Sequence, residues 1–484
     1  MTSPNTPPWP EALPAVGSAL VTTFQEAGLR CILVGAAARR YLQGEPIARH
    51  KRLDFITDAD PALNKKLAQA VAIELGGRLE DGRQRLLIVV EEPSTDGPAT
   101  TLRCQLTPMG GARPFGRQAL PPETIEGLGE PLARELVSRE ITLHAVAVDE
   151  RGDAIDPFGG MSDLADQRLT TVLPVSAMGF DSPRWILRMA RHVAYYGFEV
   201  TPEITTAARD SVVTLLDLPP EVWREEIQRA LLHRHPNRAL QFMESCGMLS
   251  LLLPEVQALV GFDESSDVHH KDLWEHTRLV VQKSRPDPVQ RWAALFHDIG
   301  KCATREIDGD NRVHFLRHED LGALLFEGIA ARLRFPAPLA EEVYFLIRNH
   351  SRVNLYTEEW SDSAVRRLIR EVGPRLESLL AFSRADITSR RESRVELVRR
   401  MMDHLEARIE ELKRIDAREP ALPKGIGHLI MEQFELPPSP TVGLLRQRLE
   451  EAVESGAVPR NLTPRDYVRV LARMLEEERA SKTT

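Results

Sequence analysis

The sequence has few cysteines, no apolar run long enough to cross a membrane, and no excess of positive charge. Its four cysteines among 484 residues show no Cys-x-x-Cys spacing, which disfavours a disulfide scaffold and predicts a reduced, cytoplasmic setting. The net charge of −9 argues against non-specific coating of nucleic acid, although a local basic surface would still bind it. We expect no contact with a membrane.

The first 14 residues are rich in Pro, Ser and Thr and lack the basic start and apolar core of a signal peptide. They predict a disordered lead-in. The remaining composition, with 42% hydrophobic and 27% charged residues, is ordinary for a folded protein. A chain of this length predicts roughly two to four domains.

Helical and strand patterns are mixed only in the first third of the chain. A helix is expected over 15–27, and a strand over 30–34 runs into Gly35, which opens another helix. Further strands are expected over 52–57, 85–90, 101–106 and 141–149. Later patterns are helical, over 163–171, 182–198, 223–232, 239–253 and a long charged stretch from about 394 to 414. The sequence therefore predicts an α+β protein with a small mixed-sheet head and an all-helical body.

One short motif carries recognisable chemistry. His297 and Asp298 stand side by side in an apolar helical run that continues to Gly300 and Lys301. The side chains of neighbouring helical residues point about 100° apart. His297 and Asp298 can therefore bind the same ion only if that ion lies over the edge of the helix. Its other ligands must come from other helices.

His276 and Asp386 are the candidates for those ligands. Two imidazoles and two carboxylates suit Mn²⁺, Fe²⁺, Co²⁺, Ni²⁺, Zn²⁺ or Mg²⁺. The alternative is a helix-edge hydrogen bond between His297 and Asp298 with no ion.

This combination resembles the HD-domain metal phosphohydrolases. The resemblance implies catalytic roles for His297 and Asp298. His318 and His350 occur along the chain in the order expected of HD domains that hold two metal ions bridged by an Asp. They are therefore candidate ligands of a second ion or phosphate contacts, and the alternative is that both are structural histidines. Lys301 is a candidate phosphate contact, or else a cation stabilised by a helix C-terminus.

Other motifs resemble the class II tRNA nucleotidyltransferase and poly(A) polymerase family. The run Ile155-Asp-Pro-Phe-Gly-Gly160 matches a family motif near the neck, and 430–443 resembles the family's C-terminal segment. The resemblance implies a polymerase β-type head, Mg²⁺ if that head is active, and RNA, including tRNA, or a nucleotide as partner. The alternative for 155–160 is a turn that fixes the head to the neck.

The head departs from the family at its catalytic positions. The family's Asp-x-Asp pair is here Arg52-Leu53-Asp54, its Gly-Gly turn is Gly35-Ala36, and no clear further acid lies in 101–106. Nucleotidyl transfer needs carboxylates that converge on divalent ions, and a cation beside Asp54 opposes their binding. The head is therefore predicted to be inactive, with Gly35, Arg39 and Asp54 as remnants.

The neck departs from the family as well. The family's Arg-Asp-Phe-Thr-Ile-Asn strand, still within the head, is changed at 139–144, and in the neck the family's base-reading Asp and Arg are replaced by Ser182 and Trp185. Three arginines at helical spacing follow, and they predict either a solvated face or an RNA-backbone contact: Arg184, Arg188 and Arg191.

The predicted segments are the lead-in (1–14), a nucleotidyltransferase-like head (15–160), a helical neck (161–262), an HD domain (263–400) and a helical tail (401–484). The sequence predicts a metal-dependent phosphohydrolase, acting on phosphomonoesters or cyclic phosphodiesters, with an inactive transferase head. One alternative is a working CCA- or A-adding transferase in which Asp54 and an unrecognised acid suffice. Another is a non-catalytic protein that binds RNA or a nucleotide.

Overall fold

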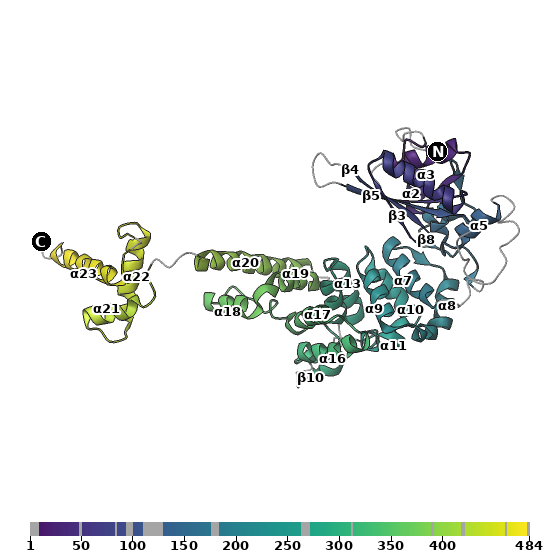
Figure 1. Ribbon diagram of the computed structural model, residues 1–484. Coiled ribbons are helices and arrows are strands. Elements are labelled where there is room, and N and C mark those ends of the chain that lie inside the picture. The colour runs from purple at the N-terminus through teal and green to yellow at the C-terminus, as the bar shows by residue number, and fades with distance from the viewer. Residues whose placement is uncertain are drawn as a thin grey trace. The chain divides into compact units, whose positions relative to one another are not determined.

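The computed structural model describes residues 9–47, 51–82, 85–92, 100–109, 129–175, 183–262, 272–310, 313–388, 392–417, 422–459 and 462–481. The chain divides into two compact units (Figure 1). One contains Met1–Leu355 and Arg375–Val398, and the other contains Tyr356–Pro374 and Arg399–Thr484. Among the described helices, none combines the length and the apolar character that a membrane span requires.

A seven-stranded mixed sheet forms the head, in the order β3-β4-β5-β2-β1-β6-β7. Strands β2 and β5 pair in parallel, and the other neighbours are antiparallel. The predicted α+β class is confirmed. The strands are β1 (Cys31–Val34), β2 (Arg52–Thr57), β3 (Arg78–Asp81), β4 (Leu86–Glu92), β5 (Thr100–Pro108), β6 (Ala147–Val148) and β7 (Ala154–Ile155).

Helices cover both faces of this sheet. Cys31 and Leu33 of β1 belong to one apolar cluster, and Ile32 and Val34 belong to another, as the alternation of a strand requires. The first cluster includes residues of α1 (Ala15–Glu26), α2 (Ala36–Leu42) and α3 (Pro61–Glu74), and the second includes residues of α5 (Glu130–Val137). The sheet is therefore held from two sides.

The lead-in prediction fails where the structure describes it. Residues 1–8 lie outside the described residues, but Ala12 and Leu13 are buried in the head core. The indole Nε1 of Trp9 also donates to the carbonyl of Glu150 at 3.1 Å. Apolar burial of this kind orders a Pro-rich segment that composition alone marks as disordered.

The strand predicted over 141–149 is mostly absent. Residues Thr142–His144 form a 3₁₀ helix, η1, and only β6 within this range is a strand. Glu140 has a φ of +65°, which turns the chain away from an extended path, and the Thr142 hydroxyl donates to Asp163 Oδ2 at 2.6 Å. The side-chain hydrogen bond thus replaces a strand ladder here.

The helix predicted over 163–171 is also shorter than expected. Helix α6 (Gly160–Ala165) ends before Gln167, whose φ is +52°, and the chain continues into a short strand, β8 (Arg168–Leu169), paired with β9 (Glu199–Val200). Likewise, the stretch 239–253 is two helices, because Gly247 has a φ of +78° between them.

The remaining body is almost entirely helical. The neck helices are α7 (Arg184–Tyr196), α8 (Pro202–Ser211), η3 (Val212–Asp217), α9 (Pro220–Leu231), α10 (Pro236–Ser245), α11 (Met248–Leu252) and α12 (Pro254–Gln257). Next come α13 (Leu273–Lys283), α14 (Pro288–Phe296), α15 (Lys301–Thr304), strands β10 (Arg305–Ile307) and β11 (Val313–Phe315), α16 (His318–Arg332), α17 (Ala337–Asn349) and α19 (Leu376–Asp386). The long charged helix, α20, spans Glu392–Ala417.

The second unit has its own apolar core. This core is formed by α21 (Ile426–Phe434), α22 (Pro440–Glu454) and α23 (Pro464–Ser481), and the unit also contains α18 (Asp362–Val372) and α20 from Arg399 onward. Ile430, Leu449 and Leu471 are fully buried against one another's helices. The apolar faces of the helices in this tail therefore pack against one another.

Helix α14 is the centre of the HD region. Asp287 caps it by accepting from the amides of Val289 and Gln290, and Trp292 stacks on Phe296 with ring centroids 5.5 Å apart. The helix is buried from Gln290 to Phe296, and its two polar side chains, Gln290 and Arg291, have hydrogen-bond partners. The helix ends at Phe296, so His297 and Asp298 follow it and do not lie inside a helix as predicted.

A glycine brings α16 against the end of α14. A Cβ on Gly300 would lie 2.1 Å from the carbonyl oxygen of His318 and 2.7 Å from the amide nitrogen of Gly322. Both are backbone atoms, so no side-chain rotation relieves the overlap. Only glycine permits this approach.

We predict that Gly300→Ala destabilises the chain by about 1–3 kcal/mol, because α16 must move away. Gly328→Ala in the same helix is the matched control, since a Cβ there meets nothing within 4 Å, and it should be neutral or stabilise by up to about 1 kcal/mol. Thermal and urea unfolding of both variants measure the difference. Equal stability of the two variants would show that the contact imposes no constraint.

Candidate functional site

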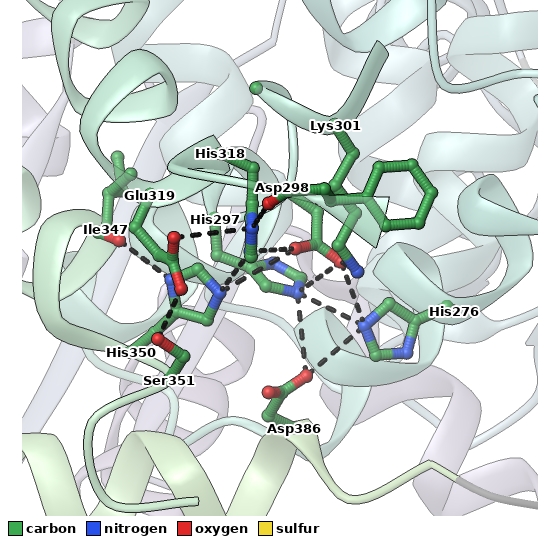
Figure 2. Close-up of polar contacts among 12 residues, drawn as sticks. His276, His297, Asp298, Lys301, His318, Glu319, Ile347, His350, Ser351 and Asp386 are labelled. Carbon is green, nitrogen blue, oxygen red and sulfur yellow. Dashed lines mark hydrogen bonds and ion pairs between the residues drawn. The ribbon is translucent and has the colours of Figure 1, made fainter. Parts of the chain in front are cut away.

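The structure brings the four predicted ligands of the first ion together. His276 comes from α13, His297 and Asp298 follow α14, and Asp386 ends α19 (Figure 2). The Nε2 atoms of His276 and His297 are 3.1 Å apart. Asp298 Oδ2 lies 3.3 and 3.1 Å from them, and Asp386 Oδ1 lies 3.2 and 3.5 Å from them. We call this set the inner site.

These spacings fit one divalent ion. Two ligand nitrogens each about 2.0–2.1 Å from an ion lie about 2.9–3.4 Å apart at octahedral or tetrahedral angles. The ring atoms opposite the site are already engaged: His297 Nδ1 pairs with the carbonyl of Ala294 at 3.0 Å, and His276 Nδ1 pairs with the Thr388 hydroxyl. A proton on Nδ1 of His297 leaves its Nε2 lone pair for the ion.

A second cluster shares Asp298. The Nε2 atoms of His318 and His350 are 3.3 Å apart and lie 3.6 and 3.7 Å from Asp298 Oδ1. Each Nδ1 pairs with a backbone carbonyl, of Phe315 at 2.9 Å and of Ile347 at 2.7 Å. We call this set the outer site. Asp298 therefore offers one oxygen to each site.

An unsatisfied atom supports this assignment. Among the described residues, the buried Asp298 Oδ1 has no hydrogen-bond partner. A buried carboxylate oxygen without a partner is costly, and a cation would satisfy it. The ligand atoms of His276, His297 and Asp298 also lie within 4.8 Å of one another, as do those of Asp298, His318 and His350.

The charges of the inner site are strongly coupled. Burial acts to lower the pKa of His297, but the carboxylates of Asp298 and Asp386 outweigh it and raise that pKa to about 10. His297 in turn helps to hold the pKa of Asp298 well below its usual range despite burial. In contrast, burial and the charge of His297 lower the pKa of His350 to about 4. Without an ion, a proton on His297 balances the carboxylates.

Lys301 lies at the first residue of α15, and its Nζ is 2.9 Å from Asp298 Oδ2. It also stands 5.5 Å from the centre of the Phe315 ring. The cation is thus bonded to a ligand of the inner site. Lys301 does not stabilise the C-terminus of α14 as a cation there would, because α14 ends five residues earlier.

Sequence reasoning missed three polar residues around these sites. The Ser351 hydroxyl donates to Glu319, Glu319 Oε2 lies 3.3 Å from His318 Nδ1, and Thr388 contacts His276. Each lies within two residues of a predicted ligand. That adjacency was the available signal. Two further histidines before α13, His269 and His270, lie outside the described residues.

The head site contains Asp54 beside the Gly35 turn. In the register of β1 and β2, Asp54 pairs with Val34, the residue before Gly35, and β5 places Gln105 on its other side. Arg52 Nε lies 3.3 Å from Asp54 Oδ1, and its Nη2 lies 3.3 Å from Gln105 Oε1. Arg52 thus neutralises the Asp54 carboxylate, whereas an Asp at that position would be a second metal ligand.

Arg139 completes this edge of the head. Its Nη1 lies 3.7 Å from where a Cβ on Gly35 would stand, and Gly35 has a φ of +77°. Burial lowers the pKa of Arg139, and the charges of Asp54 and Glu135 oppose that effect. Glu135, on α5, is the second acid whose charge acts on Arg139, and it was not recognised from the sequence.

Arg39, predicted as a remnant of the transferase site, lies on α2, which begins after the Gly35 turn. It is buried, its Nη2 donates to the Tyr196 hydroxyl at 2.6 Å, and its Nη1 donates to the carbonyl of Leu143. His144 Nε2 contacts the same hydroxyl at 3.1 Å. Arg39 therefore joins α2 of the head to α7 of the neck.

Two of the three predicted RNA-contacting arginines form internal ion pairs. Arg188 pairs with Glu140, and Arg191 Nη1 lies 3.3 Å from Glu226 Oε2. Arg184 is exposed at the start of α7. RNA contact by this helix stays a prediction. Ser182 lies outside the described residues, and Trp185 is buried.

Family models match two parts of the chain. Residues 287–452 match the HD domain, and residues 197–259 match the "Probable RNA and SrmB- binding site of polymerase A". The HD match includes His297, Asp298, His318, His350 and Asp386.

Curated relatives are named multifunctional CCA proteins. The one from Leptothrix cholodnii is 33% identical over 339 residues, covering 67% of this chain and 73% of the relative. The one from Nitrosococcus oceani is 30% identical over 371 residues, covering 74% and 84%.

Solved structures show the same fold. The Bacillus stearothermophilus CCA-adding enzyme in complex with CTP has a TM-score of 0.50 at 20% identity, with 96% of this chain and 98% of that one covered. The Thermotoga maritima CCA-adding enzyme complexed with tRNA_CCA has a TM-score of 0.50 at 13% identity, covering 96% of each.

These relatives correct the function predicted from the sequence. We had inferred from the changes at Gly35-Ala36 and Arg52-Leu53-Asp54 that the head is inactive and that hydrolysis is the main activity. That inference is wrong: relatives about 30–33% identical over most of the chain are named for CCA addition, which favours the alternative of a working transferase. The chain belongs to the family of multifunctional CCA proteins, CCA-adding enzymes with an HD domain.

Proposed function

We propose that this chain adds nucleotides to the 3′ end of tRNA with its head. The observation that carries the proposal is the position of Asp54 directly beside the Gly35 turn, fixed by the pairing of β1 with β2. Substrates of this kind are bound by relatives of the same fold, one solved with CTP and one with tRNA_CCA. A cytoplasmic location belongs to the proposal, and the four free cysteines are consistent with reducing conditions there.

The donors at Asp54 fit one Mg²⁺ ion. Such an ion is commonly held by one or two carboxylates together with the substrate phosphates. Gln105 of β5 pairs with Asp54 of β2 in the sheet and offers an amide oxygen as a further ligand. When bound, it would neutralise the triphosphate and activate the attacking hydroxyl.

The chain's own cations would add to that charge balance. The side chain of Arg52 is 63% exposed next to Asp54, and Arg139 stands behind the Gly35 turn. Guanidinium groups stabilise phosphate charge that develops during transfer. Gly35, which has no Cβ, lets the backbone approach a phosphate closely.

We predict that Asp54→Asn lowers nucleotide addition by at least about 100-fold, as expected when a group that organises transition-state charge is removed. The assay uses tRNA lacking its 3′ end, labelled CTP or ATP, and Mg²⁺. Asp81→Asn is the control, because Asp81 forms an exposed pair with Lys65. Failure of the wild-type chain to extend the tRNA would refute the transferase proposal.

The paired inner and outer sites favour a second activity alongside the first. We propose that they hydrolyse phosphomonoesters or cyclic phosphodiesters. Bound divalent ions supply hydroxide near neutral pH and polarise a phosphoryl oxygen. His297 and Asp298 would hold the ions, and Lys301 would bring a positive charge to the phosphate. The ligand set suits Mn²⁺, Fe²⁺, Co²⁺, Ni²⁺, Zn²⁺ or Mg²⁺.

We predict that His297→Ala abolishes hydrolysis of nucleoside monophosphates and 2′,3′-cyclic nucleotides and leaves tRNA extension intact. EDTA should remove the hydrolysis and added Mn²⁺ should restore it. His314→Ala is the control, since His314 pairs with Asp308 on the exposed β10–β11 hairpin. Unchanged turnover of the His297 variant would exclude this site.

We also predict that ion binding expels a proton from His297. Its raised pKa, about 10, keeps the ring protonated at neutral pH in the metal-free protein, whereas an ion needs the neutral ring. Affinity should therefore rise with pH, by about tenfold per pH unit below that pKa. Calorimetry at pH 7 in buffers of different ionisation enthalpy counts the protons released. A binding heat that is independent of the buffer contradicts the prediction.

A further inference from the structure

The two histidines of the outer site stand at helix ends. His318 is the first residue of α16, and His350 follows the last residue of α17. Arg317, which precedes α16, has a φ of +60° and makes no side-chain cap. Helix ends have the fewest backbone hydrogen bonds and fray first. Something else must keep these two rings 3.3 Å apart.

A polar pair joins those two ends. Glu319 directly follows His318, and Ser351 directly follows His350. The Ser351 hydroxyl donates to Glu319 Oε1, and the other oxygen, Oε2, lies 3.3 Å from His318 Nδ1 (Figure 2). Both side chains are partly buried, which strengthens these contacts. One carboxylate therefore touches one ligand and the neighbour of the other.

We infer that Glu319 and Ser351 are positioning residues that set the geometry and the affinity of the outer site. This inference rests on the metal-dependent centre proposed above. The pair ties the N-terminus of α16 to the C-terminus of α17, so both imidazoles face Asp298 Oδ1 from fixed positions. Neither residue belongs to the proposed ligand set of Asp298, His318 and His350.

The Glu319 carboxylate contacts the imidazole ring of His318 as well as linking the ends of α16 and α17. The Nδ1 proton of His318 lies between the carbonyl of Phe315 at 2.9 Å and Glu319 Oε2 at 3.3 Å. A carboxylate at Nδ1 fixes the tautomer and makes Nε2 a stronger ligand. Loss of such a partner typically weakens metal binding by about 10–100-fold.

The inner site is held differently. His297 Nδ1 pairs with the carbonyl of Ala294, and His276 Nδ1 pairs with the Thr388 hydroxyl. In the part of the chain that the structure describes, these two Nδ1 atoms have no carboxylate partner. Changes at Glu319 or Ser351 should therefore alter the outer site and spare the inner one.

The test is a Mn²⁺ titration of the full chain, followed by electron paramagnetic resonance and calorimetry. The wild-type chain should bind two ions and give the spin-coupled signal of a neighbouring pair. Ser351→Ala and Glu319→Gln should each weaken the second ion by about 10–100-fold, abolish the coupled signal at limiting Mn²⁺, and leave the first ion unchanged. Ser351→Thr, which keeps the hydroxyl, should restore the second ion.

Ser245→Ala is the matched control, because that hydroxyl donates to the carbonyl of Phe242 in the neck. Two ions bound with wild-type affinity in both variants would overturn the inference and leave the proposed hydrolysis intact. Equal weakening of both ions, or a single ion in the wild-type chain, would also overturn it. No ion bound to the wild-type chain would remove the proposed hydrolysis as well, and only that result does so.

Discussion

The helical body depends on the burial of one carboxylate, Asp298, between imidazoles on two sides. An isolated buried charge is prohibitively costly, so its surroundings must supply positive charge and hydrogen bonds. His276, His297 and Lys301 do so for one oxygen, whereas the other oxygen faces His318 and His350 at more than 3.5 Å. The arrangement of α13, α14, α16, α17 and α19 follows from this requirement, because each brings at least one group to the same point.

The head meets the opposite condition. Asp54 is partly exposed, and Arg52 of the same strand already neutralises it. Such a carboxylate needs no resident ion for stability, so an ion there would arrive with the triphosphate. The two sites thus suit different tasks: the first would hold a metal as part of the fold, and the second would take one up together with its substrate.

Much of the helical centre could be predicted from the sequence, because His276, His297, Asp298 and Asp386 occur in a recognisable order with Gly300 after them. Their convergence could not be predicted from spacing, since it depends on contacts between helices far apart in the chain. Glu319 and Ser351 were missed for the same reason: each looks ordinary alone, and only the packing of α16 on α17 pairs them. The inactive head was wrongly inferred because a changed motif was equated with a lost activity, and the strand over 141–149 failed because Glu140 takes a left-handed conformation.

Arg39 has a mechanical consequence. It lies on α2, which starts at the Gly35 turn, and it is anchored by the Tyr196 hydroxyl of α7 and the carbonyl of Leu143. The side chain is buried, so a displacement of the turn would also disturb its hydrogen bond to the neck helix. A change of conformation at the Gly35 turn and one at α7 would therefore occur together and not independently.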